Sequence, residues 1–444
     1  MKRVIFKQKK YAMLSRIILF RAFLVGILSL FLSFSSAGQS LIDFLKNQPE
    51  VKSIDTLQGP TFFSETYQIS IRQPLNYKDT ANGFFLQRIF VNHKAVDRPV
   101  VFITEGYAAD YAALPNHVNE LSSFLSANQI CVEHRYFGQS VPAPINWQFL
   151  TVENAANDHH HIVQLFKKFY AGKWLNTGIS KGGQTALFHR AFFPNDVDAT
   201  VAYVAPLNFG VEDGRHEPFL QEVGPDSCRQ RIHAFQRQVL QKRKQIIPLL
   251  NNYAKAHQFT FPMNLNEVLD YLVLEYAFSF WQWGSSCSDI PPADASAEDL
   301  FNYLTNISPP SYFSHEGAAS FRAFFYQAAA ELGYYGYDTS ALKDWLVIQS
   351  TANYVNQYMI PPGSKPVYSA KSSNELADFL KHKAQNIWLI YGEHDPWTAS
   401  GAAIRKRGNN HKIILENGDH KTRIRLLPEK KQLKVIKQLN QIMD

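Results

Sequence analysis

The alternation of apolar and polar segments along residues 84–207 predicts strands that alternate with helices. Short apolar runs typical of buried strands are separated by stretches whose apolar residues recur at helical spacing. The predicted strands are residues 84–93, 98–106, 129–137, 174–175 and 198–207, and the predicted helices are residues 111–127, 152–170 and 184–190. Strands that alternate with helices favour a mostly parallel sheet covered on both faces.

The pattern changes between residues 210 and 361. Long stretches of helical spacing replace the alternation, as in residues 228–257 and 266–284. Two apolar strand-like runs, 386–395 and 411–417, then resume the first pattern before a basic helix that starts at Glu429. The sequence therefore predicts an α/β core interrupted by a large helical insertion, without an internal repeat.

The first 38 residues have the order of a secretory signal peptide. They contain seven basic residues and no acidic one, followed by an apolar run at residues 22–34 and then "SSAG". A retained N-terminal anchor is the alternative, but the run is short for a membrane span and Arg21 limits its extension. We therefore expect a secreted or periplasmic protein that has no membrane contact after signal cleavage.

The expected domains follow from these three patterns. They are a signal peptide at 1–38, a first core part at 39–209, a helical cap at 210–361 and a second core part at 362–444.

The net charge of +7 comes from the leader. Seven of the 45 basic residues lie there, which leaves 38 basic residues against 38 acidic ones in the remaining chain. A neutral chain gives no electrostatic reason to expect a nucleic-acid partner. The oligomeric state stays open.

The chain has only three cysteines. Cys131 lies in an apolar strand and is expected to pack as a small hydrophobic residue. Cys228 and Cys287 lie in polar segments of the insertion, and export permits them to form a disulfide. The run "DHHHIV" at 158–163 is predicted as a solvated helix face, because adjacent histidines on a helix point in different directions. We expect no metal and no cofactor.

Ser180 lies in "GISKGG", with a glycine two residues before it and another two after it. A strand precedes this segment and a helix follows it. A sharp strand-to-helix turn requires small flanking residues and exposes the serine hydroxyl. The pattern alone also fits an ordinary loop, so a nucleophilic serine requires partners elsewhere in the chain.

Two residues fit the partners that a nucleophilic serine needs. A base must accept the hydroxyl proton, and a carboxylate must orient that base. Asp395 and His420 each directly follow a predicted late strand, in the chain order serine, acid, histidine. The sequence therefore predicts a triad of Ser180, Asp395 and His420. The oxyanion donors are expected to be the backbone N–H groups of Lys181 and Tyr107.

Further motifs resemble known peptidase families. "VEHRYFGQS" at 132–140 resembles a signature of the prolyl carboxypeptidase and dipeptidyl-peptidase II family. "GISKGG" at 178–183 and "YGEHDPW" at 391–397 are more similar to the secreted bacterial tripeptidyl aminopeptidases, and "YQAAAELGYYGY" at 326–337 is similar to a cap motif in both. The first family has a longer Gly-rich block than "ITEGYAAD" and more cysteines, so the second is the preferred match. This resemblance implies an α/β-hydrolase core with a large helical cap and a serine exopeptidase that acts on peptides.

An exopeptidase must bind a free chain terminus. Glu105, Glu331 and Glu133 are candidates for binding an α-ammonium, while a buried ion pair between Glu133 and Arg135 is the alternative for the last. The aromatic runs of the cap are expected to form its core, and some could line a pocket for apolar or prolyl side chains. The main hypothesis is an aminopeptidase. The alternatives are a carboxypeptidase, an esterase or lipase, and a binding protein without turnover, which the intact triad disfavours.

Overall fold

The computed structural model describes residues 40–444, and the predicted leader at 1–38 lies outside them. The chain divides into two compact units, Met1–Gln48 and Pro49–Asp444. The first contains helix α2 (Leu41–Lys46), which begins at Ser40, whose hydroxyl oxygen accepts a hydrogen bond from the backbone of Asp43. Within residues 40–444, no helix combines the length and apolar character needed to cross a membrane.

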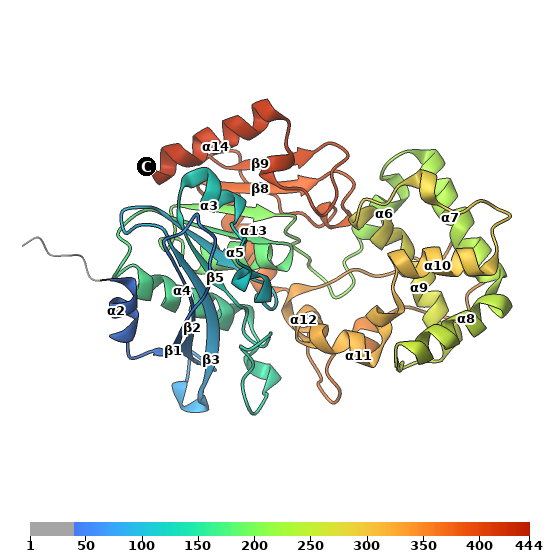
Figure 1. The fold of residues 1–444 in the computed structure, drawn as a ribbon. Helices are drawn as coiled ribbons and strands as arrows, with labels where there is room; N and C mark the ends of the chain where they lie inside the picture. Colours follow the sequence, from blue (N-terminus) through green and yellow to red (C-terminus); the bar gives the residue numbers. More distant parts are fainter. Residues whose placement is uncertain (1–39) are drawn as a thin grey trace, which may run out of the picture. The chain divides into compact units, whose positions relative to one another are not determined.

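A nine-stranded sheet lies at the centre of the second unit, in the order β1-β2-β3-β5-β4-β6-β7-β8-β9 (Figure 1). The strands are β1 (Val51–Thr56), β2 (Glu65–Pro74), β3 (Phe84–His93), β4 (Val100–Thr104), β5 (Asn128–Val132), β6 (Trp174–Ile179), β7 (Ala199–Tyr203), β8 (Ile387–Gly392) and β9 (His411–Leu415). The first three strands pair antiparallel, as do β3 and β5, and all pairs from β5 to β9 are parallel. The carboxyl ends of β4 to β9 therefore share one edge.

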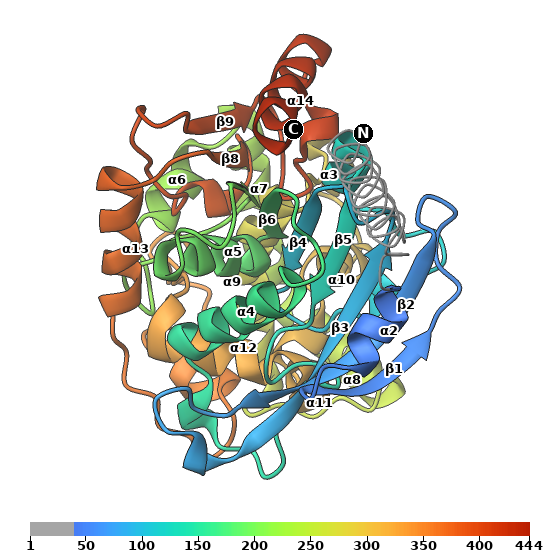
Figure 2. The ribbon, with the colours of Figure 1, turned by 90° about the vertical axis from the view of Figure 1, so that its left-hand side faces the viewer.

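Helices cover both faces of the sheet (Figure 2). One layer contains α4 (Val152–Phe166), α5 (Lys181–Phe192) and α13 (Lys371–His382), and the other contains α3 (Glu120–Leu125) and α14 (Glu429–Met443). The predicted α/β fold class is confirmed.

The helix predicted at 111–127 is shorter in the structure. A 3₁₀ turn occupies Asp110–Ala113, and α3 begins only after Asn119, whose side chain accepts a hydrogen bond from the backbone of Leu121. Pro115 lies between the two segments and cannot continue a helix, because it lacks an N–H group and its ring clashes with the preceding turn.

The helical insertion lies between β7 and β8 and is called the cap here (Figure 1). Its α-helices are α6 (His216–Glu222), α7 (Asp226–Gln241), α8 (Arg243–Ala256), α9 (Leu265–Gln282), α10 (Ala297–Ile307), α11 (His315–Ala318) and α12 (Arg322–Gln327), and π-helical turns occupy Ala328–Leu332 and Val355–Met359. The core of the cap is rich in buried aromatic rings and includes Trp397 from the loop after β8. Hydrophobic packing therefore joins the cap to that loop.

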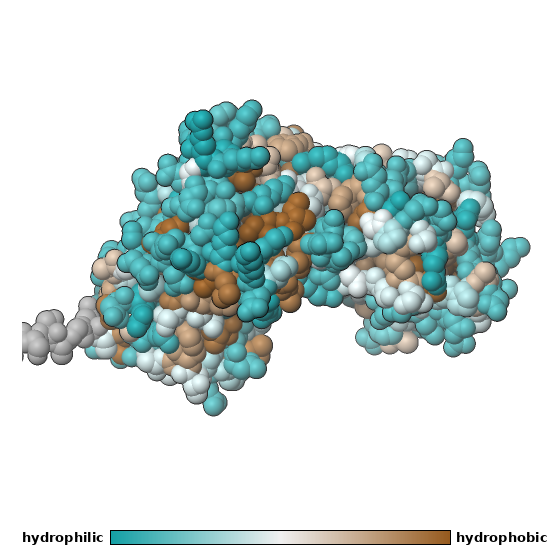
Figure 3. All heavy atoms as spheres, turned by 90° about the horizontal axis from the view of Figure 1, so that it is seen from above, coloured by the Kyte–Doolittle hydropathy of each residue, from teal (hydrophilic) through white to brown (hydrophobic). Residues whose placement is uncertain are grey.

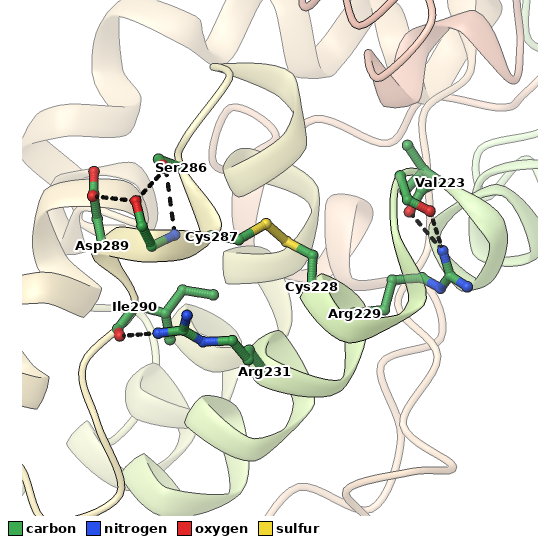
Figure 4. Close-up of a disulfide and its surroundings, with 10 residues drawn as sticks. Val223, Cys228, Arg229, Arg231, Ser286, Cys287, Asp289 and Ile290 are labelled. Carbon is green, nitrogen blue, oxygen red and sulfur yellow. Dashed lines mark hydrogen bonds between the residues drawn. A yellow bond between two sulfur atoms is a disulfide. The ribbon is translucent and has the colours of Figure 1, made fainter.

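A disulfide joins Cys228 on α7 to Cys287, with the two Cα atoms 5.6 Å apart (Figure 4). The Arg231 guanidinium donates a hydrogen bond of 2.7 Å to the carbonyl of Ile290 beside it. The bridge and this hydrogen bond fix the start of α7 to the segment that follows α9. Cys131 is free and buried in β5.

Candidate active site

Ser180 occupies a strained turn between β6 and α5. Its backbone has φ 55° and ψ −123°, a conformation that a non-glycine residue adopts only when the surroundings impose it. A Cβ at Gly178 would lie 2.2 Å from the carbonyl of Gly182, so glycine is required there. The Ser180 N–H donates to the carbonyl of Tyr203 at 2.8 Å, which fixes the turn against β7. This is the sharp strand-to-helix turn that the sequence predicts around Ser180.

Asp395 and His420 come together through the loops that follow β8 and β9. His420 Nδ1 donates a hydrogen bond of 2.7 Å to Asp395 Oδ2, and Asp395 is fully buried. The other carboxylate oxygen accepts a hydrogen bond of 3.1 Å from the backbone of Trp397. The backbone N–H of His394 donates to the carbonyl of Gly418 at 2.8 Å, so the two loops are in direct contact.

The arrangement suits proton transfer from a hydroxyl. The hydrogen bond at Nδ1 of His420 leaves Nε2 as the ring nitrogen that can accept a proton, and the buried carboxylate stabilises the resulting cation. Ser180 lies at the carboxyl end of β6, and β6 is separated from β8 by β7 alone. The three predicted triad residues therefore come from one edge of the sheet.

The loop after β4 approaches the serine turn closely. A Cβ at Gly106 would lie 2.7 Å from the backbone nitrogen of Gly182, so only glycine fits this position. The Lys181 ammonium donates a hydrogen bond of 2.7 Å to the carbonyl of Gly106. This carbonyl belongs to the peptide group whose N–H is that of Tyr107, so the side chain of Lys181 fixes the plane of that peptide.

Lys181 is buried in an aromatic setting. It is 2 % exposed, and its Nζ atom lies 5.0 Å from the ring centroid of Phe137 and 5.6 Å from that of Tyr107. Burial lowers the pKa of the Lys181 ammonium well below its ordinary value, whereas the nearby Glu105 carboxylate acts in the opposite direction. The position of the Lys181 side chain beside the loop after β4 was not predicted from the sequence.

Glu105 is partly exposed and lies one residue before this peptide. Its carboxylate accepts a hydrogen bond from the hydroxyl of Tyr111, and burial raises the pKa of Glu105. An ammonium bound here would lie next to the predicted oxyanion loop. The amino terminus of an extended tripeptide lies about 10 Å from its other end, at roughly 3.3 Å per residue, which weakens the case for Glu105 as an ammonium site.

The end of cap helix α9 contacts the histidine loop. The carbonyl of Gln282 accepts a hydrogen bond of 3.0 Å from the backbone N–H of His420. The ring of Trp283 meets the imidazole of His420 edge to face at 5.7 Å and is 48 % exposed. Trp283 therefore forms an apolar wall beside the imidazole of His420. From the sequence, Trp283 was noticeable only as part of an aromatic run of the cap, and its position beside His420 was not predicted.

A second aromatic group, called the Tyr107 group here, surrounds the ring of Tyr107 in the loop after β4. The rings of Phe137, Phe321 and Phe324 are 5.4–6.0 Å from that of Tyr107. Figure 3 shows a face on which hydrophobic side chains form patches within a largely hydrophilic surface. Among exposed large hydrophobic residues, Phe321 and Trp283 both belong to the surroundings of the site.

Glu133 has a structural role instead of the predicted substrate contact. It is fully buried and accepts hydrogen bonds from Arg88, Ser140 and the backbone N–H groups of Ala109 and Gln139. These donors leave the carboxylate closed to a ligand, so the substrate-binding interpretation is wrong.

The alternative prediction, a buried ion pair between Glu133 and Arg135, is also wrong, because Glu133 does not pair with Arg135. Arg135 instead binds Asp158 with two hydrogen bonds of 2.7 Å and 2.8 Å. The prediction that residues 158–163 form a solvated face is wrong for Asp158 and His159, which are both buried. Among the described residues, no group of histidine, cysteine and acidic side chains is arranged to hold a metal ion.

Glu331 contacts the first turn of α4. Its Oε2 accepts a hydrogen bond of 2.7 Å from the backbone N–H of Val152, a helix-terminal donor that has no partner within the helix. Burial raises the pKa of Glu331. This carboxylate therefore stabilises the junction between the cap and α4, which weakens its case as an ammonium site.

The parallel sheet, the strained serine turn and the hydrogen-bonded acid and histidine define an α/β-hydrolase. The family model described as PS-10 peptidase S37 matches residues 43–439, so the chain belongs to this peptidase family. It is 32 % identical over 378 residues to the prolyl tri/tetrapeptidyl aminopeptidase of Streptomyces mobaraensis, a match that covers 83 % of this chain and 77 % of the relative. The predicted resemblance is confirmed, and the chain is a serine peptidase.

Solved structures are more distant. A proline iminopeptidase of Mycobacterium smegmatis is 14 % identical, with a TM-score of 0.39, over 84 % of this chain and 98 % of the other. A prohormone-processing carboxypeptidase of Saccharomyces cerevisiae is 12 % identical, with a TM-score of 0.37, over 86 % of this chain and 91 % of the other.

Proposed function

We propose that Ser180, His420 and Asp395 form the catalytic triad of an aminopeptidase. Ser180 Oγ attacks the scissile carbonyl while His420 Nε2 takes its proton, and His420 then gives this proton to the leaving amine. Water hydrolyses the acyl-enzyme by the same route. The observation that carries this proposal is the 2.7 Å hydrogen bond between His420 and the buried Asp395, at the sheet edge where Ser180 occupies its strained turn.

The oxyanion of the tetrahedral intermediate binds two backbone N–H groups in this proposal. One belongs to Lys181, directly after the nucleophile, and the other to Tyr107, whose peptide plane is fixed by the Lys181 side chain. The Gly106 backbone supports the assignment, because it lies close enough to the serine turn to exclude any side chain.

We also infer the length class of the products from the relative of Streptomyces mobaraensis, whose name states prolyl tri/tetrapeptidyl release. The aromatic surfaces of Trp283 and of the Tyr107 group suit an apolar proline ring before the cleaved bond. The basic and apolar order of residues 1–38 supports export to the periplasm or the medium.

The test is hydrolysis of a panel of peptides with free and with acetylated N-termini. We expect release of tri- and tetrapeptides from free N-termini only, with products identified by mass spectrometry. Equal cleavage of acetylated and free peptides would contradict the aminopeptidase. Release of single residues from the C-terminus would indicate a carboxypeptidase, and hydrolysis of esters without peptides would indicate an esterase.

A further inference from the structure

A pocket lies inside the cap, between helices α6, α7 and α9. It has a volume of about 270 Å³. The side chains of Leu274, Phe278 and Trp281 form its apolar walls, and Glu217 and Gln236 bring polar groups into it. A small apolar pocket with a few polar groups is the usual form of a ligand site. We call it the cap pocket.

One hydrogen-bond acceptor in the cap pocket lacks a donor. Glu217 Oε2 is buried and has no hydrogen-bond partner within residues 40–444. The side chain of Gln236 interacts with that of His233, which also lines the pocket. Gln236 is 4 % exposed, and its Nε2 atom already donates to the carbonyl of Val273 at 2.7 Å. Buried acceptors without donors are costly, so a ligand that supplies N–H groups would be stabilised here.

The acidic groups around the cap pocket favour a cation. Burial raises the pKa of Glu217, and the nearby Asp338, Asp213 and Glu212 raise it further. Burial lowers the pKa of His233, which also lines the pocket and therefore opposes a cation less than a charged group would. Arg229 also lines the pocket, but it donates to the carbonyls of three successive residues at the end of α6 and just after it, including Val223 at 3.0 Å (Figure 4). Its guanidinium therefore fixes the backbone at the end of α6, near the disulfide, and is not free to bind a ligand.

The cap pocket adjoins the loop that carries the catalytic acid. The ring of Trp281 lies 5.2 Å from that of His394, and the ring of Phe278 lies 5.3 Å from that of Trp397. One layer of aromatic rings thus separates the pocket from the residues on either side of Asp395.

We propose that the cap pocket binds the ammonium group and apolar side chain of the free amino-terminal residue of a short peptide. Glu217 accepts hydrogen bonds from the ammonium, and the side chain packs on Phe278 and Trp281. This inference rests on the proposed function, because an aminopeptidase meets free amino termini both on its substrates and on its products. The terminus can belong to either source.

The binding test uses the full chain with Ser180→Ala, which prevents turnover. Calorimetry compares a tripeptide with an apolar first residue against its acetylated form. We expect binding of the free tripeptide to weaken about ten- to a hundredfold on Glu217→Gln, the loss typical of one hydrogen bond to a charged group. Glu222→Gln, an exposed change on the same helix, is the matched control and should bind as the parent does.

Ala277→Trp, which fills the pocket and leaves the carboxylate in place, should cause a similar loss, and thermal unfolding verifies the fold of each variant. Unchanged affinity in both variants, or equal binding of acetylated peptide by the parent, would overturn the proposal.

Kinetics of Glu217→Gln with Ser180 intact distinguish binding of a substrate's amino terminus from binding of a released product. A lower kcat/KM for free peptides assigns the site to the substrate terminus. An unchanged kcat/KM with weaker inhibition by a tripeptide product assigns it to released peptide. Absence of all peptide hydrolysis would contradict the proposed function and leave the binding test valid.

Discussion

The side chain of Lys181 provides a sharp test of the oxyanion site. Lys181→Met keeps an unbranched side chain, shorter by the terminal nitrogen, and removes the donor that lies 2.7 Å from the carbonyl of Gly106. The peptide plane before Tyr107 then loses its anchor, while the backbone N–H of residue 181 is kept. A hydrogen bond contributes about 0.5–1.5 kcal/mol from a neutral donor and about 1.5–3 kcal/mol from a charged one, and burial lowers the pKa of Lys181. Complete loss of one oxyanion donor costs about 10²–10³ in kcat, which sets the upper limit.

We therefore expect kcat of Lys181→Met to fall about threefold to a few hundredfold, because the oxyanion forms only after substrate binds. KM should change little for the same reason. Steady-state and burst kinetics with a chromogenic tripeptide amide measure both quantities. Thermal unfolding verifies that the variant is folded.

The matched control is Lys412→Met on β9. Its Nζ atom also donates to a backbone carbonyl, that of Ala402 at 3.0 Å, and lies 5.0 Å from the ring centroid of Tyr391. This change should leave kcat near that of the parent. A folded Lys181→Met enzyme with parental kcat, or with a raised KM alone, would refute the role given to Lys181.

Three further predictions concern the nucleophile, the oxyanion loop and the cap. Ser180→Ala should abolish hydrolysis without a change in circular dichroism, and Asp395→Asn should lower kcat by about 10⁴, as expected when the histidine loses its orienting charge; parental rates in either variant would contradict the triad. Gly106→Ala should inactivate the enzyme, because its methyl group would lie 2.7 Å from backbone atoms of the serine turn; full activity would show that the loop is not held there. Removing the bridge by Cys228→Ser and Cys287→Ser should lower the free energy of unfolding by about 4 kcal/mol in urea titrations, given the separation of 59 residues; an unchanged midpoint would argue against a stabilising bridge.

The strands from β3 onward could be predicted from their apolar runs. Strand β3 has the predicted bounds of 84–93, since its apolar residues form a continuous pattern. Strands β1 and β2 were not predicted. Strand β1 lies at the sheet edge and has no buried residue that would create an apolar alternation, whereas β2 has alternating buried residues that the sequence interpretation missed. The helical stretch 228–257 becomes two helices, α7 and α8, which meet at Lys242. Periodicity alone does not locate such a break.

The sequence also predicted the residues that directly follow strands, because parallel strands bring their carboxyl ends to one edge. Asp395 and His420 meet for this reason. The carboxylates were harder to interpret. Glu133 and Glu331 are bound by donors from segments distant in sequence, and Glu217 lines a pocket built from three helices. Only tertiary packing decides which acidic groups are closed to a ligand.

The most direct measurement for the central claim is covalent labelling of the active serine. The full-length enzyme is treated with a fluorophosphonate and digested, and the modified peptide is located by mass spectrometry. The account predicts one modification, on Ser180 in the segment 174–190. It also predicts that the labelling of Ser180 is much slower in His420→Ala, since the hydroxyl then has no base. Inhibition of peptide hydrolysis with the label on another residue, or undiminished labelling of Ser180 without His420, would contradict it.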